Sequence, residues 1–208
     1  MPTMKAVSIL RPALAALLAA TAGLSAAAGE DYDAQVREMM QSSFKENGIA
    51  SKYRQLQLDF QKTCSALVPP SAEAMRQIEA EQMQTVRWPA DGKFFGDWKE
   101  GEKIAQSGRG LTWTDKAGES NGGGCYNCHQ LAPQELSFGT IGPSLHRYGK
   151  LRGSDEGMVK YTWGKLWNAK AYNACSQMPR MGDAHILSEA QIKHVMAYLF
   201  DPASPVNQ

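Results

Sequence analysis

Two apolar stripes at helical spacing occupy the first part of the chain. Within 36–44 and again within 53–67, apolar residues recur three or four positions apart, which is the period of one face of a helix. Pro69 and Pro70 end the second stripe, and Ser71 is a suitable N-cap for a third helix that runs toward Arg87. We interpret both stripes as core faces and the segment 88–92 as a linker.

The second part of the chain alternates short helices with long loops. The spacing predicts a helix over 97–107, which Gly108 ends, and another from Ser154 or Asp155 to about residue 168. The glycine- and proline-rich stretch 130–153 reads as loop, and a capping box at 188–191 opens the last helix. We find no convincing strand, so the expected fold class is all-α.

Residues 1–28 have the pattern of a removable signal peptide. Lys5 and Arg11 precede an alanine- and leucine-rich run, and small residues at 25–28 offer a cleavage site before Gly29. The run is short and rich in alanine for a membrane anchor, and no later stretch is apolar enough to span a bilayer. We therefore expect an exported protein of the periplasm with no membrane span in its mature form.

Charge argues against a nucleic-acid partner. The chain has 22 basic and 21 acidic residues, and the leader holds two of the basic ones, which leaves a mature protein near neutrality. Proteins that bind nucleic acids present a clearly basic surface. The mature chain of roughly 180 residues is long enough for one packed core and an additional element.

The pentapeptide Cys125-Tyr-Asn-Cys128-His129 carries the strongest chemical signal. Two thiols three positions apart can bond covalently to one haem c, and the histidine that follows becomes an axial ligand of its iron. The alternatives are a chance match, a redox dithiol and half of a zinc site. No second Cys-x-x-Cys pair exists to complete a zinc site, and a glycine run rather than a strand precedes the motif.

Met178 is the candidate for the second axial ligand. Pro179 stiffens the backbone beside it, and a neutral thioether favours ferrous iron, as an electron carrier requires. Met181 lies three residues away and is the main rival. The remaining histidines are interpreted as surface or packing residues: His146, His185 and His194.

Two further sets of residues are candidates for the surroundings of the haem. The carbonyl of Pro143, about a dozen residues after His129, is a reasonable acceptor for the free N–H of the ring, although a plain Gly-Pro turn explains the local sequence equally well. Five aromatic residues could line the haem, and each of them is as well explained by ordinary core packing: Trp113, Tyr148, Tyr161, Trp163 and Trp167.

Cys64 and Cys175 remain after the motif is assigned. Exported proteins seldom keep idle thiols, so we expect a disulfide between them, which would tie the second N-terminal helix to the loop of Met178. The alternative is that Cys175 is itself a haem ligand.

The C-terminal part resembles class I cytochromes c. The resemblance rests on Gly101 in a first helix, the Cys-x-x-Cys-His motif, Ile141-Gly-Pro143, the Met178 loop and an amphipathic last helix. Three segments resemble more narrowly the SoxX family, the monohaem subunits of the SoxAX complexes of thiosulfate oxidation: 139–145, 161–164 and 172–180. The resemblance implies a cytochrome c domain over 94–208, preceded by a helical extension over 29–93.

The SoxX resemblance also implies a function. Cys125 and Cys128 would hold the haem, with His129 and Met178 as axial ligands, although Met181 stands where the family leads us to expect an aromatic residue. The chain would be the electron-accepting subunit of a heterodimeric L-cysteine S-thiosulfotransferase, which couples thiosulfate oxidatively to a cysteine of the carrier SoxYZ. The catalytic cysteine-ligated haem would lie on a SoxA partner, and a small soluble cytochrome would take the electrons.

Two rival functions remain at this point. A free-standing electron shuttle would need no enzyme partner, but it would also not need the extension over 29–93. A haem enzyme with an open distal site, such as a peroxidase, is disfavoured by a methionine that fills the sixth position.

Overall fold

The computed structural model describes residues 31–107, 109–116 and 123–208, so the leader expected at 1–28 lies outside the described part. The described α-helices are α1 (Tyr32–Ser43), α2 (Asp59–Ser65), α3 (Ala72–Met83), α4 (Trp98–Ala105), α5 (Tyr148–Arg152), α6 (Glu156–Trp167) and α7 (Glu189–Phe200). Short 3₁₀ turns are η1 (Lys52–Gln55), η2 (Cys125–Asn127), η3 (Ala169–Ala171) and η4 (Pro205–Asn207). Apart from one isolated bridge between Asn47 and Ala50, these residues contain no strand, which confirms the all-α class.

The chain divides into two compact units, one ending at Met40 and the other comprising Gln41–Gln208. Helix α1 crosses this division and has no buried residue, so the interpretation of its stripe as a core face was wrong. The second stripe is also not one helix, because the backbone is extended between η1 and α2. Of its apolar positions, Tyr53 and Leu56 are exposed, whereas Phe60 is buried.

Side-chain caps set the start of the three helices that position the site. Asp97 accepts a hydrogen bond from the backbone N–H of Lys99 at the start of α4, and Asp155 does the same for Gly157 and Met158 at the start of α6. Ser188 and Gln191 form the expected capping box of α7. These three N-termini agree with the sequence predictions.

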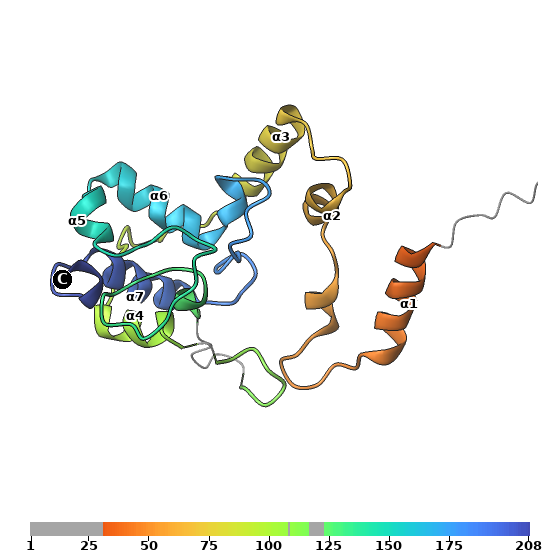
Figure 1. Cartoon of the computed structure of the whole chain (residues 1–208), viewed down its shortest axis with the longest axis horizontal. Coiled ribbons are helices and arrows are strands. Elements are labelled where there is room, and N and C mark those ends of the chain that lie inside the picture. Colours follow the sequence, from red (N-terminus) through yellow and green to blue (C-terminus); the bar gives the residue numbers. More distant parts are fainter. Residues whose placement is uncertain (1–30, 108, 117–122) are drawn as a thin grey trace, which may run out of the picture. The chain divides into compact units, whose positions relative to one another are not determined.

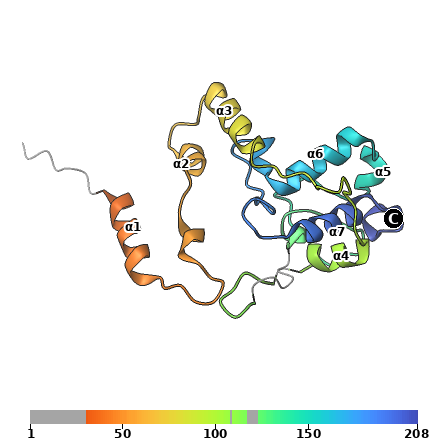
Figure 2. The same cartoon turned by 180° about the vertical axis from the view of Figure 1, so that it is seen from behind.

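Helices α4 and α7 lie side by side in the core of the larger unit (Figures 1 and 2). Their close approach depends on Gly101, where a Cβ atom would lie 2.1 Å from the backbone oxygen of His194. His194 also accepts a hydrogen bond from Asp97 N–H through its Nδ1 atom, at 2.8 Å. The two helices are therefore locked by backbone contact as well as by their buried apolar faces.

The segment before residue 94 contributes directly to the same core. The indole N–H of Trp163 donates to the carbonyl of Arg87 at 2.8 Å, and that of Trp167 donates to Thr85 at 3.0 Å. Both rings are buried, as is Val86 between these two acceptors. Helix α6 is thus held against the end of the N-terminal extension.

Helix α5 lies inside the stretch predicted as loop. It has five residues, too few to show a helical period, and its Tyr148 packs edge-on against Phe200 of α7 with ring centroids 5.4 Å apart. Burial against α7, which the local sequence does not reveal, accounts for the difference. No helix of the described residues is long and apolar enough to cross a membrane.

Candidate haem cavity

A cavity of about 610 Å³ brings together most of the candidate site residues. Its wall includes both cysteines and the histidine of the motif, together with Pro143, Met178 and Met181. Apolar side chains from α5, α6, α7 and the preceding loops complete it: Ile141, Leu145, Tyr148, Leu151, Tyr161, Leu166 and Leu199. This volume is within the usual range of cofactor pockets in proteins, roughly 300–1,000 Å³.

The Cys-x-x-Cys-His motif folds as one tight turn at this cavity. The carbonyl of Cys125 accepts hydrogen bonds from the backbone N–H of Cys128 at 3.1 Å and of His129 at 2.9 Å. Gly124, which precedes the turn, adopts a left-handed conformation. Neither Cys125 nor Cys128 is in a disulfide, so the turn presents two thiols and an imidazole to the same space.

The ring of His129 is held by the segment 142–143. Its Nδ1 atom lies 2.6 Å from the carbonyl oxygen of Pro143, so the hydrogen bond expected from the sequence is present. A Cβ atom on Gly142 would lie 2.2 Å from the ring, so only glycine allows this approach. With Nδ1 as the donor, the lone pair of Nε2 is available for an iron atom.

The two candidate methionines differ in their surroundings. Met178 is partly buried and packs at the edge of the core, whereas Met181 is only 5% exposed and belongs to it. The backbone of Met181 is fixed by three hydrogen bonds, one from its own N–H to Leu166 and two to its carbonyl from the turn that follows. Met181 is therefore accounted for by packing, whereas Met178 packs only at the edge of the core and remains the candidate ligand.

The electrostatics of the motif do not suit a redox dithiol. Burial raises the pKa of the Cys125 thiol to about 11. Reactive dithiols depend instead on a lowered pKa, which supplies the thiolate at neutral pH. The described residues contain no group of three His, Cys, Asp or Glu side chains placed to hold a metal ion.

The other histidines are placed differently. His194 caps α4, and His185 is exposed in the turn before α7. His146 lines the cavity, but its Nε2 atom lies 3.2 Å from the carbonyl of Gln208. Of the three, only His146 is a neighbour of the cavity.

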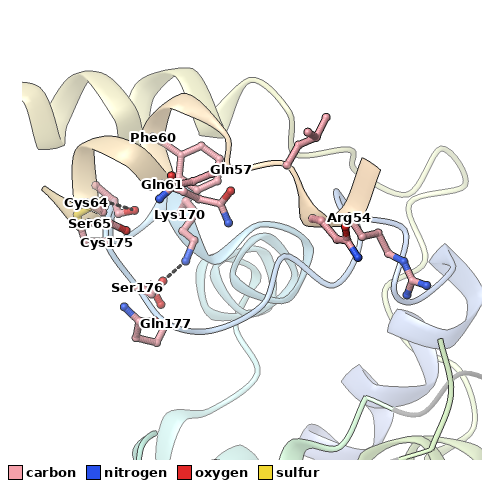
Figure 3. Close-up of a pocket in the computed structure, with 13 residues that line it drawn as sticks. Arg54, Gln57, Phe60, Gln61, Cys64, Ser65, Lys170, Cys175, Ser176 and Gln177 are labelled. Carbon is pink, nitrogen blue, oxygen red and sulfur yellow. Dashed lines mark hydrogen bonds between the residues drawn. A yellow bond between two sulfur atoms is a disulfide. The ribbon is translucent and has the colours of Figure 1, made fainter. Parts of the chain in front are cut away.

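Cys64 and Cys175 form the expected disulfide, with 5.4 Å between their Cα atoms. The pairing leaves Cys175 without a thiolate, so the alternative that it is a haem ligand does not hold in this structure. Figure 3 shows the disulfide at a second cavity of about 330 Å³, next to Lys170, Ser176 and Gln177. Through this bond α2 is joined to the loop that carries Met178.

Of the five aromatic residues named as possible walls, Tyr148 and Tyr161 line the larger cavity. Trp163 and Trp167 belong to the core, and Trp113 is exposed. Sequence reasoning did not identify the cations at the cavity, Arg152 and Lys165. The helical period places Lys165 on the same face of α6 as Tyr161, and this was the available signal.

Comparison with known proteins gives one informative relative. No protein-family model matches the chain. An uncharacterized lipoprotein of Aquifex aeolicus (strain VF5) is 33% identical over 187 residues, which cover 87% of this chain and 89% of the relative. The chain belongs to the family of this lipoprotein. The aligned region includes most of the described structure, so the relationship covers nearly the whole length of both chains.

Proposed function

We propose that the chain is an exported monohaem c-type cytochrome, the electron-transfer subunit of a SoxAX-type L-cysteine S-thiosulfotransferase. The observation that carries this proposal is the larger cavity, where two unpaired thiols, an oriented imidazole and a thioether border one largely apolar space. The name of the lipoprotein relative supports export, and the periplasm is the proposed compartment.

The residues at the cavity fit a haem c. Cys125 and Cys128 would attach it, His129 and Met178 would be its axial ligands, and Pro143 would orient the histidine. When bound, haem supplies a one-electron couple between ferrous and ferric iron. With haem bound, the apolar part of the wall would limit the access of water, and the neutral thioether of Met178 would favour ferrous iron, so both would raise the reduction potential.

Cations at the cavity suit the carboxylates that a haem carries. Arg152 and Lys165 both line it, and burial lowers the pKa of Lys165. The Glu79 carboxylate offsets part of that cost of burial, and a propionate beside Lys165 would offset it further. These two side chains are the candidates to bind the haem propionates.

The enzymatic context is proposed from the SoxX resemblance. A SoxA-type subunit would form the heterodimer and contribute the catalytic centre, with SoxYZ and a small soluble cytochrome as transient partners. No residue of this chain is proposed as catalytic. Helices α2 and α3 support the heterodimer over a free-standing shuttle, because they add to the minimal domain and are packed against the Met178 loop.

Expression with export and a haem-attachment system tests the cofactor. We expect one covalently bound haem per chain by mass spectrometry of the denatured protein. The ferric protein should show the weak long-wavelength absorption band of methionine-ligated haem. Met178→Ala should abolish this band and lower the potential, whereas the control variant Met181→Leu, which also removes a thioether but nearly conserves the volume, should retain both. The opposite result would assign the ligand to Met181.

Co-purification tests the enzymatic context. The tagged chain, isolated from its native host, should bring with it a second, cysteine-ligated cytochrome in equimolar amount. The isolated pair should transfer thiosulfate to a SoxYZ-type cysteine in the presence of an electron acceptor. A chain that purifies alone with its haem would be a free-standing shuttle.

A further inference from the structure

We infer that the Cys64–Cys175 disulfide is a thiol-accessible redox site that controls the position of Met178. In its oxidised form the disulfide holds the loop in place, and reduction by a dithiol releases it. This inference rests on the proposed function, because it concerns Met178 as an axial ligand. It assigns to the disulfide a regulatory role beyond stability.

The disulfide lies between the two cavities. Cys175, Ser176 and Gln177 line both of them, and Met178 follows directly in the chain. Cys64, on the opposite side of the bond, belongs to α2 and lines only the smaller cavity. A movement of Cys175 therefore changes the wall of the larger cavity within three residues of the proposed ligand.

The remaining contacts that hold this loop are non-covalent. The backbone N–H of Ala174 donates to the Glu79 carboxylate at 3.1 Å, and Lys170 Nζ donates to the carbonyl of Ser176. Ala174 packs in a small cluster with Phe60 of α2 and Ile78 of α3. After reduction the loop would depend on non-covalent contacts alone, which also include Arg180 over the ring of Phe60 and the hydrogen bond from Met181 N–H to Leu166. Each hydrogen bond contributes about 1 kcal/mol.

The smaller cavity gives a thiolate access to the bond. Both cysteines are partly buried and line this space, and four glutamines contribute its polar wall: Gln55, Gln57, Gln61 and Gln177. Lys170 also lines it and is the cation near the disulfide, whereas the guanidinium of Arg54 is bound to the carbonyls of Ile49 and Leu111. No acidic side chain lines the cavity, and the Glu79 carboxylate nearby is bonded to Ala174 N–H. A cationic site beside a disulfide favours both the approach of an attacking thiolate and the departure of the thiolate it displaces. Figure 3 shows the amino group of Lys170 directed toward Ser176, next to the disulfide.

A dithiol can supply the electrons and protons that reduce the Cys64–Cys175 disulfide. One thiolate of the donor attacks a sulfur of the Cys64–Cys175 bond, which breaks and leaves a mixed disulfide and one cysteine thiolate. The second thiol of the donor then displaces the other cysteine, and the donor leaves as a disulfide. Two electrons and two protons pass to Cys64 and Cys175.

If reduction loosens the loop, an external ligand should displace Met178 from the iron more easily. An external ligand such as imidazole binds iron only in molecules where Met178 has moved away. Its apparent affinity is therefore proportional to the population of that open state, and we expect reduction to raise it about tenfold. Amide hydrogen exchange over 173–181 should accelerate in the same samples.

The test uses the haem-loaded chain in two forms. In one, the disulfide is reduced with dithiothreitol and both thiols are alkylated; the other passes through the same steps without dithiothreitol. Ferricyanide then returns the iron of both to the ferric state before imidazole titration and hydrogen exchange. The double variant Cys64→Ser/Cys175→Ser should match the reduced form and show no further response to dithiothreitol.

The outcomes separate the inference from the proposed function. Equal imidazole affinity in the two forms, with both thiols alkylated by mass spectrometry, overturns the inference and leaves the haem assignment intact. A chain without haem, or a ligand band that survives Met178→Ala, overturns the proposed function and the inference with it. If the double variant does not fold, the reduced and alkylated native chain still decides the question.

Discussion

Gly142 contacts the imidazole of His129 so closely that no side chain fits between them. A Cβ atom at position 142 would lie 2.2 Å from Cε1 and 2.5 Å from Nδ1 of the ring. The next carbonyl along the chain, that of Pro143, accepts the hydrogen bond from Nδ1. Two consecutive residues thus fix the position and the tilt of the proposed ligand.

Gly142→Ala should therefore disturb the site directly. The added methyl group must displace the ring or the backbone, and either movement lengthens the bond between His129 and Pro143. We expect a loss of about 1–3 kcal/mol in the free energy of unfolding, as for other overpacked sites. The ratio of covalent haem to protein should also fall. Denaturant unfolding and haem quantification measure the two effects.

Gly123→Ala is the matched control. A Cβ atom there would meet only ordinary contacts, at 3.4 Å from the sulfur of Cys125 and 3.5 Å from Ile104. This variant should remain within about 0.5 kcal/mol of the parent and keep its haem. Equal behaviour of the two variants would show that the contact between Gly142 and His129 is not what constrains the ring.

The parts of the fold that were predicted correctly depend on neighbours in the sequence. Asp97, Asp155 and Ser188 cap the helices that follow them, because a cap needs only an N–H two or three residues ahead. The failures concern burial and, in the second stripe, the extended backbone between η1 and α2. An apolar stripe at 36–44 is helical as expected, but which surface covers it is a property of the tertiary fold, and α1 has no buried residue.

The candidate site likewise has a part that local sequence predicted and a part that depends on the tertiary fold. The motif at 125–129 and the hydrogen bond to Pro143 could be read from the sequence, because their spacing follows from chemistry. The wall formed by Leu166 and Leu199, and the cation Arg152, could not, whereas for Lys165 the helical period gave only a shared face with Tyr161. Their place depends on how α5, α6 and α7 pack, and no local pattern encodes that arrangement.

Asn168 should be a major determinant of stability. It is fully buried, and its Nδ2 atom donates to Thr85 Oγ1 at 2.8 Å and to Gln82 Oε1 at 3.0 Å. Its Oδ1 atom accepts from the backbone N–H of Lys170. Asn168→Ala removes these hydrogen bonds from partly buried partners, leaves a void at a fully buried position, and should cost about 1–3 kcal/mol. A lower midpoint of denaturant unfolding at constant slope would measure this loss.

Asn47→Ala is the control for Asn168→Ala. Asn47 is exposed and takes part in the isolated bridge only through its backbone, so truncation should change stability by less than about 0.5 kcal/mol. A loss of the same size in both variants would contradict the role assigned to the buried network.

Met181 should contribute to packing rather than to iron ligation. Its side chain is 5% exposed, so Met181→Ala leaves a void in the core and should cost about 2–5 kcal/mol. Met181→Leu nearly conserves the volume and should cost less than about 1.5 kcal/mol. Thermal or denaturant unfolding measures both values. If Met181→Leu lost as much stability as Met181→Ala, packing would not be the function of this residue.

Tyr198 should make the folded state sensitive to alkaline pH. Burial raises its pKa from 10.0 to about 12, so the folded chain keeps the phenol proton after the unfolded chain has lost it. Between these values the unfolded state binds fewer protons, and stability must therefore fall as the pH rises. Below pH 10 the contribution is present in full. Its complete loss amounts to about 1–3 kcal/mol.

A variant without the Tyr198 hydroxyl shows how much of the alkaline loss of stability comes from this phenol. In Tyr198→Phe the ring remains in the core but cannot ionise, so the free energy of unfolding should decline less steeply than in the parent between about pH 10 and pH 12. Tyr53→Phe, at a position that is 68% exposed, should follow the parent curve. Denaturant unfolding at a series of pH values provides the comparison. Parallel curves for Tyr198→Phe and the parent would mean that the Tyr198 phenol ionises as readily in the folded chain as in the unfolded one.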